Sequence, residues 1–174
     1  MKKIYIIQMH TKTMPSRIVK LFTRYKYSHV AISFNKNCDY IYSFGRRSLR
    51  SFLYGGFTMQ DKNGEFFKKY NKTKCRVYEV SVTNEQYNEL IKIIKYMKKN
   101  KYDYGYDYLG IVLRFLKIPV TFKKKYVCSY FVAELLKEAK VYEFDKDTCF
   151  VKPKDFENID IFDLIYTGDY ALYR

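Results

Sequence analysis

The stretch Tyr126–Leu136 constrains the fold more than any other part of the chain. Its apolar residues recur at helical spacing and form one face of a helix. A polar, lysine-rich segment precedes this pattern, so Cys128 is predicted to stand at or just before the first helical turn. The apolar positions of the predicted helix are Phe131, Val132, Leu135, Leu136 and Ala139.

A thiol at the start of a helix can be chemically active. Unpaired backbone N–H groups and the positive end of the helix dipole stabilise a thiolate there. Such a thiol can have a pKa well below the value of about 8.5 of a free cysteine. Cys128 is equally explained as a small buried hydrophobe, as most free cysteines are. The helix alone does not decide between the two interpretations.

Length and composition predict one folded domain covering residues 1–174. Apolar residues make up 48% of the 174 residues, which is enough for a substantial core. The formal net charge is +15. This charge predicts attraction to anionic surfaces or polymers. A basic surface that is merely solvated explains the same composition.

The cysteines and the apolar runs bear on cofactors and location. The chain has four cysteines without C-x-x-C or zinc-ligand spacing, so we expect neither a metal nor another cofactor. The run Ile4–Ile7 is too short for a signal-peptide core, and no stretch approaches the roughly 20 apolar residues of a membrane span. We therefore expect a cytoplasmic protein with reduced thiols.

Elsewhere the pattern predicts an α+β fold, in which a small, mostly antiparallel sheet packs against helices. The segment Gly45–Lys74 is predicted to be irregular, with a turn at Gly55–Phe57. Predicted helices begin near Thr13–Ser16, after a capping box at Thr83, at Tyr104 (ending at Leu116) and at Cys128. Predicted strands are Ile4–Met9, Tyr27–Phe34, Tyr40–Phe44, Arg76–Val82, Ile161–Tyr166 and Tyr170–Tyr173.

Two further groups of residues are candidates for function. His29 opens a predicted strand, although a histidine in that position is often only structural. Arg46 and Arg47 follow the next strand and could bind a phosphate or carboxylate. A solvated loop explains the arginines as well. Lys124, in the lysine cluster ahead of Cys128, is a third candidate for binding anions.

The order of the motifs resembles a known superfamily. A histidine opening the strand S-H-V-A-I-S-F precedes a helix of the form C-S-x-F-V-A-E-L-L. This order is similar to that of the circularly permuted papain-like cysteine hydrolases, which include relatives of NlpC-type hydrolases and of lecithin retinol acyltransferase. The segments Tyr42–Arg46, Gly55–Phe57 and Pro153–Phe156 resemble an uncharacterised bacterial group within it.

The resemblance implies a site and an activity. Cys128 is the expected nucleophile, His29 the general base and acid, and Ser43 a weak orienting group where relatives often carry a charged or amide side chain. The hydroxyl of Tyr27 or Tyr126 is a candidate donor to an oxyanion.

The implied function is a thiol hydrolase or acyltransferase acting on a peptide-like or acyl substrate through an acyl-cysteine. Two alternatives stay open. One is an inactive papain-like scaffold that binds nucleic acid or an anionic membrane through its basic surface. The other is a purely structural interaction domain.

Overall fold

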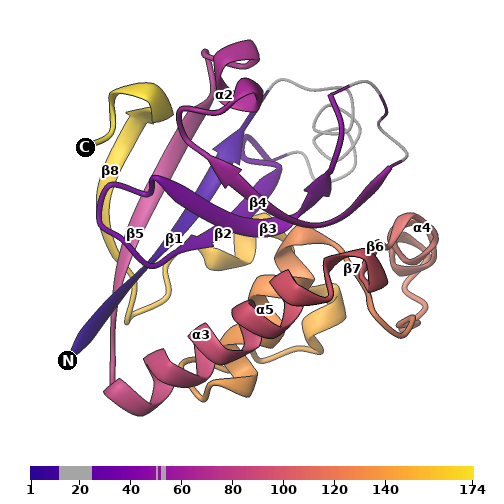
Figure 1. Cartoon of the computed structure of the whole chain (residues 1–174). Helices are drawn as coiled ribbons and strands as arrows, with labels where there is room; N and C mark the ends of the chain where they lie inside the picture. The colour runs from indigo at the N-terminus through magenta and orange to yellow at the C-terminus, as the bar shows by residue number, and fades with distance from the viewer. Residues whose placement is uncertain (12–24, 50, 52–53) are drawn as a thin grey trace.

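The computed structural model describes residues 1–11, 25–49, 51 and 54–174, and these form an α+β fold built on one curled, mixed sheet (Figure 1). The strands are β1 (Lys2–His10), β2 (His29–Ser33), β3 (Tyr40–Arg46), β4 (Gly55–Asp61), β5 (Lys74–Val82), β6 (Gly105–Tyr106), β7 (Lys125–Tyr126) and β8 (Asp163–Asp169). The helices are α2 (Glu65–Lys69), α3 (Asn84–Lys99), α4 (Tyr108–Phe115) and α5 (Cys128–Glu138). Short 3₁₀ helices are η1 (Lys101–Asp103), η2 (Thr148–Phe150), η3 (Pro153–Phe156) and η4 (Tyr170–Leu172).

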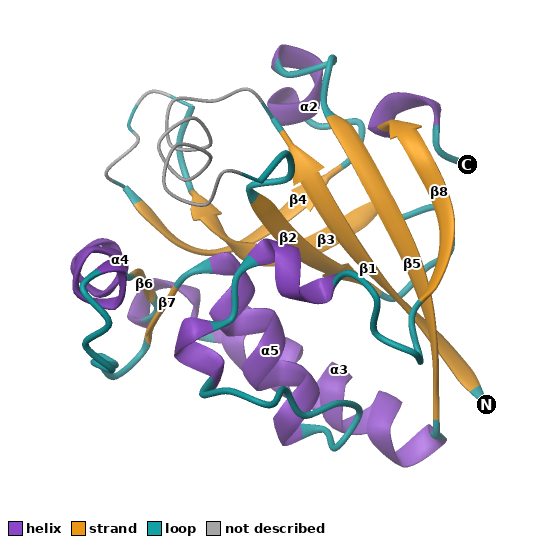
Figure 2. Cartoon of the chain, turned by 180° about the vertical axis from the view of Figure 1, so that it is seen from behind, coloured by secondary structure: helices purple, strands orange, loops and turns teal. Residues whose placement is uncertain are grey.

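The strands lie in the order β7-β6-β4-β3-β2-β1-β5-β8. Neighbouring strands are antiparallel except for β6 and β7, which are parallel. Both α3 and α5 pack on one face of this sheet, whereas α4 lies beside the short strands β6 and β7 (Figures 1 and 2). The predicted helix near Thr13–Ser16 falls outside the described residues.

Two buried cores lie on the two faces of the sheet, because side chains alternate along β1. Ile4 and Ile6 belong to the core beneath α3 and α5, which we call the helix-face core. Tyr5, Ile7 and Met9 belong to the opposite core, which we call the far-face core. The helix-face core also contains Val30, Ile32, Phe44, Leu90, Ile94, Phe131, Val132, Leu135 and Leu136. The far-face core also contains Ala31, Cys38, Ile41, Phe67, Cys75, Val77, Tyr170 and Tyr173.

Local signals in the sequence place both long helices. The capping box at Thr83 is confirmed, because its side chain accepts from the Gln86 N–H while the Gln86 side chain accepts from the Thr83 N–H. Cys128 is the first residue of α5, as the apolar pattern predicts. No side chain caps this helix, since its N-cap residue is Val127.

The predicted turn at Gly55–Phe57 is wrong. These residues begin β4, which pairs with the whole length of β3. Gly56 is needed there because the Tyr104 carbonyl and the Arg47 guanidinium occupy the space that a Cβ would take. The glycine therefore allows a close approach of the backbone rather than a reversal of the chain.

Two other segments differ from the predicted elements. The predicted helix from Tyr104 starts only at Tyr108, because Gly105 and Tyr106 first pair with neighbouring strands. Near the C-terminus a single strand, β8, is followed by η4 in place of a second strand.

Candidate functional site

The start of α5 places the Cys128 thiol against strand β2. The side chain of Cys128 is only 6% exposed. The backbone N–H groups of Val30, Ser129 and Cys128 itself lie near enough to the sulfur to act toward a lower thiol pKa. The Ser129 hydroxyl donates to the Val151 carbonyl at 2.6 Å and so fixes the first turn of the helix. The thiol thus sits beside the residue that follows His29.

The backbone of β2 is open to these contacts because β2 and β3 part near its start. The two strands pair at Ile32 and Tyr42. Closer to His29, the N–H of Val30 faces the thiol, while its carbonyl accepts a 2.6 Å hydrogen bond from the Ser43 hydroxyl. We call this place the β2–β3 junction. At this junction the backbone of Val30 contacts the Cys128 thiol and the Ser43 hydroxyl, where a paired strand would otherwise supply backbone partners.

His29 approaches the same junction from the other side. Met9, its partner on β1, belongs to the far-face core, so strand alternation directs the imidazole to that face. A Cβ built on Gly45 of β3 would lie 3.6 Å from His29 Cε1, which places the ring next to β3. The imidazole is half-buried. The structure thus brings Cys128 and His29 to the β2–β3 junction from opposite faces of the sheet.

Burial changes the titration of both groups. It lowers the pKa of His29 to about 4 and raises the pKa of the Cys128 thiol. The three backbone N–H donors act on the thiol in the direction expected for a helix start, but burial outweighs them. The expectation of a lowered thiol pKa is therefore wrong for this structure. Near neutral pH the resting groups are an uncharged thiol and an uncharged imidazole.

Ser43 is buried and its hydroxyl proton is used by the Val30 carbonyl. Within the described part of the chain, no hydrogen bond joins Ser43 to His29. Its predicted role as the group that orients the imidazole stays a prediction. What the contact provides is an anchor for Val30, whose N–H in turn contacts the thiol.

Neither predicted oxyanion donor lies in a described contact with the thiol. The ring of Tyr27 lies beneath the Arg76 guanidinium, with 5.2 Å from ring centroid to Cζ. Tyr126 packs against Phe44 with 5.1 Å between ring centroids. Burial raises the pKa of Tyr126, and the negative charges of nearby glutamates on α5 raise it further. The Tyr126 hydroxyl therefore lies close to carboxylates.

A tyrosine that the sequence did not single out lies near the thiol. Tyr106 of β6 is close enough to Cys128 for the two groups to interact electrostatically. Burial holds the pKa of the Tyr106 hydroxyl well above its usual value, so the hydroxyl keeps its proton and can donate it to an oxyanion. Only the pairing of β6 with β4 and β7 brings this residue next to α5.

Gln8 is a second residue that the sequence did not reveal. It is fully buried on β1 and pairs with Val30 in the sheet. Its amide nitrogen donates to the Pro153 carbonyl at 2.5 Å, and its oxygen accepts from the hydroxyls of Tyr25 and Tyr78. Its hydrogen bonds are thus made within the protein, and they tie β1 to η3 behind the junction.

The three predicted anion-binding residues have partners within the protein. Arg46 donates to the Tyr70 hydroxyl at 3.0 Å, beside α2. Arg47 donates to the Tyr104 carbonyl at 2.5 Å, next to η1. Lys124 pairs with Asp103 of η1 at 2.8 Å. Because Arg46 contacts α2 while the other two contact η1, the three charges are not gathered in one site, and anion binding by them stays a prediction.

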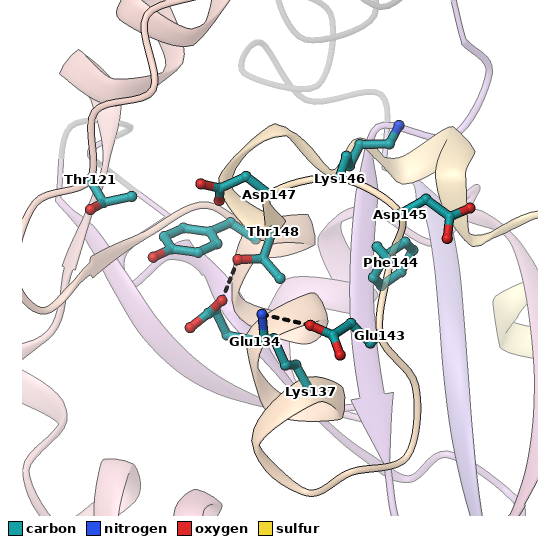
Figure 3. Close-up of a pocket in the computed structure, with 10 residues that line it drawn as sticks. Thr121, Glu134, Lys137, Glu143, Phe144, Asp145, Lys146, Asp147 and Thr148 are labelled. Atoms are coloured by element: carbon teal, nitrogen blue, oxygen red, sulfur yellow. Dashed lines mark hydrogen bonds and ion pairs between the residues drawn. The ribbon is translucent and has the colours of Figure 1, made fainter.

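An open hollow lies farther along α5 and is separate from the thiol (Figure 3). Its volume is about 540 Å³, and neither Cys128 nor His29 lines it. Lys137 and Glu143 form an ion pair of 2.8 Å across it, and Thr148 donates to Glu134. Its walls carry more carboxylates than lysines, so this hollow does not suit the anionic surfaces or polymers to which the net charge predicts attraction. Its lining residues are Thr121, Tyr130, Glu134, Lys137, Glu143, Phe144, Asp145, Lys146, Asp147 and Thr148.

Comparison with known proteins gives no independent indication of what this site does. No protein-family model matches the chain, and no curated protein sequence matches it. Among the described residues, no group of three or more histidine, cysteine, aspartate or glutamate side chains is arranged to hold a metal ion. The geometry of the β2–β3 junction is therefore the basis for assigning a function.

Proposed function

We propose that the protein is a thiol hydrolase or acyltransferase on a permuted papain-like fold, with Cys128 as nucleophile and His29 as general base and acid. One observation carries the proposal. The thiol at the first residue of α5 contacts the backbone of Val30, directly after His29, where β2 and β3 part. A thiol at a helix start and an imidazole at the start of the adjoining strand are the two groups that acyl transfer through sulfur requires.

The chemistry follows from the uncharged state of the pair. As the Cys128 sulfur attacks a substrate carbonyl, the thiol proton passes to the imidazole of His29 through the opening where β2 and β3 part. The Tyr106 hydroxyl and the N–H groups at the start of α5 are the donors available to the resulting oxyanion. His29 then gives its proton to the leaving amine, alcohol or thiol, and an acyl-cysteine remains. Water releases the acid, or another acceptor takes the acyl group.

The proposed substrate is a peptide-like or acyl compound containing an amide, ester or thioester bond. A reduced thiol is required, which fits a reducing compartment such as the cytoplasm. Because burial lowers the pKa of His29 to about 4, the imidazole is available as a base at any pH above that value. We therefore expect turnover to keep its value down to about pH 5 and to fall below pH 4.

The decisive experiment measures alkylation of Cys128 by iodoacetamide against pH, with mass spectrometry to assign the labelled thiol. We expect His29→Ala to label more slowly than the wild type between pH 6 and 8, because no base accepts the thiol proton. The matched control is His10→Ala, which removes the only other histidine of the chain. It should label like the wild type.

Hydrolysis of a small activated ester gives a second measurement. Cys128→Ala should abolish any acyl-enzyme, and His29→Ala should lower turnover by roughly 10²- to 10⁴-fold, the usual contribution of a general base. Equal labelling profiles in the wild type and His29→Ala would show that no cysteine–histidine pair exists. The scaffold would then be a binding protein, as in the alternative interpretation.

A further inference from the structure

Helix α4 carries apolar side chains on its outer side. Leu109, Val112 and Leu116 are 58%, 57% and 61% exposed, at positions i, i+3 and i+7 of one helical stripe. Ile118, just beyond the helix, is 42% exposed. We call these four residues the α4 face. Large apolar side chains gathered on one surface are unusual for a helix whose other side packs on the protein.

The inner side of α4 holds a buried ion pair, so the orientation of the helix is built into the fold. Asp107 accepts a 3.0 Å hydrogen bond from the Gly110 N–H and caps the helix. Its other oxygen pairs with Arg114 at 2.8 Å, and both side chains are almost completely buried. The Arg114 guanidinium also lies over the Tyr130 ring of α5. Turning α4 to bury its leucines would expose this ion pair, and breaking a buried pair is costly.

The segment that carries the α4 face is positively charged. The chain leaves β6, forms α4 and returns at β7, and the segment 108–128 contains no aspartate or glutamate. Lys117, Lys123 and Lys125 in this segment are exposed. The face is thus an apolar stripe with a cationic rim on a chain of net charge +15. A second copy of the protein is disfavoured as its partner, because two such rims would repel each other.

We propose that the α4 face docks on the surface of an anionic lipid bilayer. Short helices that lie in a membrane interface combine an apolar stripe with flanking lysines. Anionic leaflets attract such lysines by about 1 kcal/mol each. Among the described helices, none is long and apolar enough to cross a membrane. The protein therefore rests on the bilayer through α4, and this docking does not depend on the proposed catalytic chemistry.

Docking in this manner brings the thiol site to the membrane. The ring of Tyr106 contacts that of Tyr108, the first residue of α4, with 4.8 Å between ring centroids. Tyr106 also interacts with Cys128, which follows β7 after a single intervening residue. An acyl group carried by a lipid, or by a protein on the membrane, would reach the β2–β3 junction from this side.

The first experiment measures cosedimentation of the protein with vesicles of phosphatidylcholine containing 30% phosphatidylglycerol, and with vesicles of phosphatidylcholine alone. We expect binding to the anionic vesicles only. The double variant Leu109→Gln/Leu116→Gln should lower the partition coefficient by at least about tenfold, because each buried CH₂ group that is removed from the lipid weakens partitioning by roughly fourfold.

The matched control is Leu164→Gln/Leu172→Gln, which changes two leucines of similar exposure at the opposite end of the molecule (Figures 1 and 2). This control should bind within twofold of the wild type. Two triple variants with the same loss of charge distinguish the effect of the lysines near the α4 face from the effect of the total charge. Lys117→Gln/Lys123→Gln/Lys125→Gln should weaken binding more than Lys95→Gln/Lys98→Gln/Lys99→Gln on α3 does.

A second measurement uses the absence of tryptophan from the chain. A single Leu116→Trp substitution gives a unique fluorophore on the α4 face, and Leu164→Trp gives one on β8. With anionic vesicles, Leu116→Trp should shift its emission to the blue and be quenched by brominated lipid, while Leu164→Trp should change little. This test does not depend on how the glutamine variants fold.

Three results would overturn the proposal. The first is no binding to anionic vesicles at low salt. The second is equal vesicle binding by the wild type and the Leu109→Gln/Leu116→Gln variant, or equal response of both tryptophans, since charge alone would then explain adsorption. The third is a dimer in light scattering that Leu109→Gln/Leu116→Gln converts to a monomer, which would assign the face to a second copy.

Discussion

The two faces of the sheet hold cysteines in different surroundings. On the far face, Cys38 and Cys75 are buried among apolar side chains, and burial raises the pKa of each to about 12. On the helix face, burial also raises the pKa of Cys128, but three backbone N–H groups oppose it. Burial alone thus raises the pKa of a thiol and makes it unreactive. At a helix start, backbone N–H donors oppose this rise in pKa without adding a charged group.

The comparison also explains why the β2–β3 junction is the candidate site. The far-face core closes over its two cysteines with the rings of Phe67, Tyr170 and Tyr173. The helix-face core ends at Cys128, where β2 has lost its pairing with β3 and turns its backbone to the thiol. We therefore expect the reactive thiol to be Cys128, at the edge of the helix-face core, and not Cys38 or Cys75 inside the far-face core.

The largest expected effect concerns the core that holds α5 in place. Phe131 packs against Phe44 and Phe57 with 5.1 and 5.9 Å between ring centroids. Phe131→Ala should lower the free energy of unfolding by about 3 to 5 kcal/mol. It should also speed iodoacetamide labelling of Cys128 in the native protein, because α5 opens more often.

Phe67→Ala is the matched variant on the far face, where the ring packs 4.7 Å from Tyr170. It should cost stability without speeding the labelling of Cys128. Urea unfolding and native-state labelling of both variants test this pair. If Phe67→Ala accelerates Cys128 labelling as much as Phe131→Ala does, the two cores open as one unit.

The next effect is a pH dependence of stability caused by His29. Its pKa is about 4 in the folded protein and about 6.5 in an unfolded chain. Between these values the unfolded chain binds more protons, so stability rises with pH through this window and is fully present above pH 6.5. On acidification to pH 4, the free energy of unfolding should fall by at most about 3 kcal/mol. The fall should be smaller than this limit because the His29 ring keeps some contact with solvent.

Urea unfolding of the wild type and His29→Gln between pH 4 and 7 measures this dependence. His29→Gln should flatten the profile in this window, and His10→Gln should not. A steeper decline below pH 4 has other sources, because carboxylates titrate there. An unchanged slope in His29→Gln contradicts the buried, neutral imidazole.

A smaller effect separates the thiols themselves. Cys128 should react with iodoacetamide at pH 8 faster than Cys38 or Cys75, since burial raises the pKa of all three thiols but backbone N–H groups oppose this rise at Cys128. Peptide mapping after brief labelling gives the three rates in one sample. Reaction of Cys75 before Cys128 would mean that the helix start gives the thiol no advantage.

The smallest effect concerns Ser43. Ser43→Ala removes a buried hydrogen bond to the Val30 carbonyl and should cost about 1 to 2 kcal/mol. Because Val30 also contacts the thiol, the labelling rate of Cys128 should change as well. Ser33→Ala is the control, since Ser33 lies on β2, the strand that contains Val30, and its hydroxyl donates to the Tyr40 carbonyl at 2.8 Å. It should cost a similar amount of stability and leave the labelling unchanged.

The sequence by itself determined the elements that local rules encode. The apolar pattern after Cys128 predicts α5 and its first residue, and the capping box at Thr83 predicts α3. The short apolar runs predict β1 and the β2–β3 hairpin. These features depend on neighbours a few residues apart, so their physical cause lies within the segment itself.

Only the tertiary structure decided the features that depend on distant partners. Gly55 and Gly56 have the composition of a turn, yet they lie in a strand because β3 offers a complete row of hydrogen-bonding partners. Tyr106 reaches the thiol only because β6 pairs between β4 and β7. The hydroxyl of Ser43 serves Val30 because the parted strands leave that carbonyl free.

Helix α4 shows the same limit most directly. Its pattern of leucines is that of a helix buried in a core, and no local rule gives its orientation. The buried ion pair of Asp107 with Arg114 holds Arg114 inward and leaves the apolar stripe in solvent. Leaving a buried charge without its partner costs more free energy than exposing a leucine to solvent. The contacts of two charged side chains therefore determined which face the helix presents to solvent.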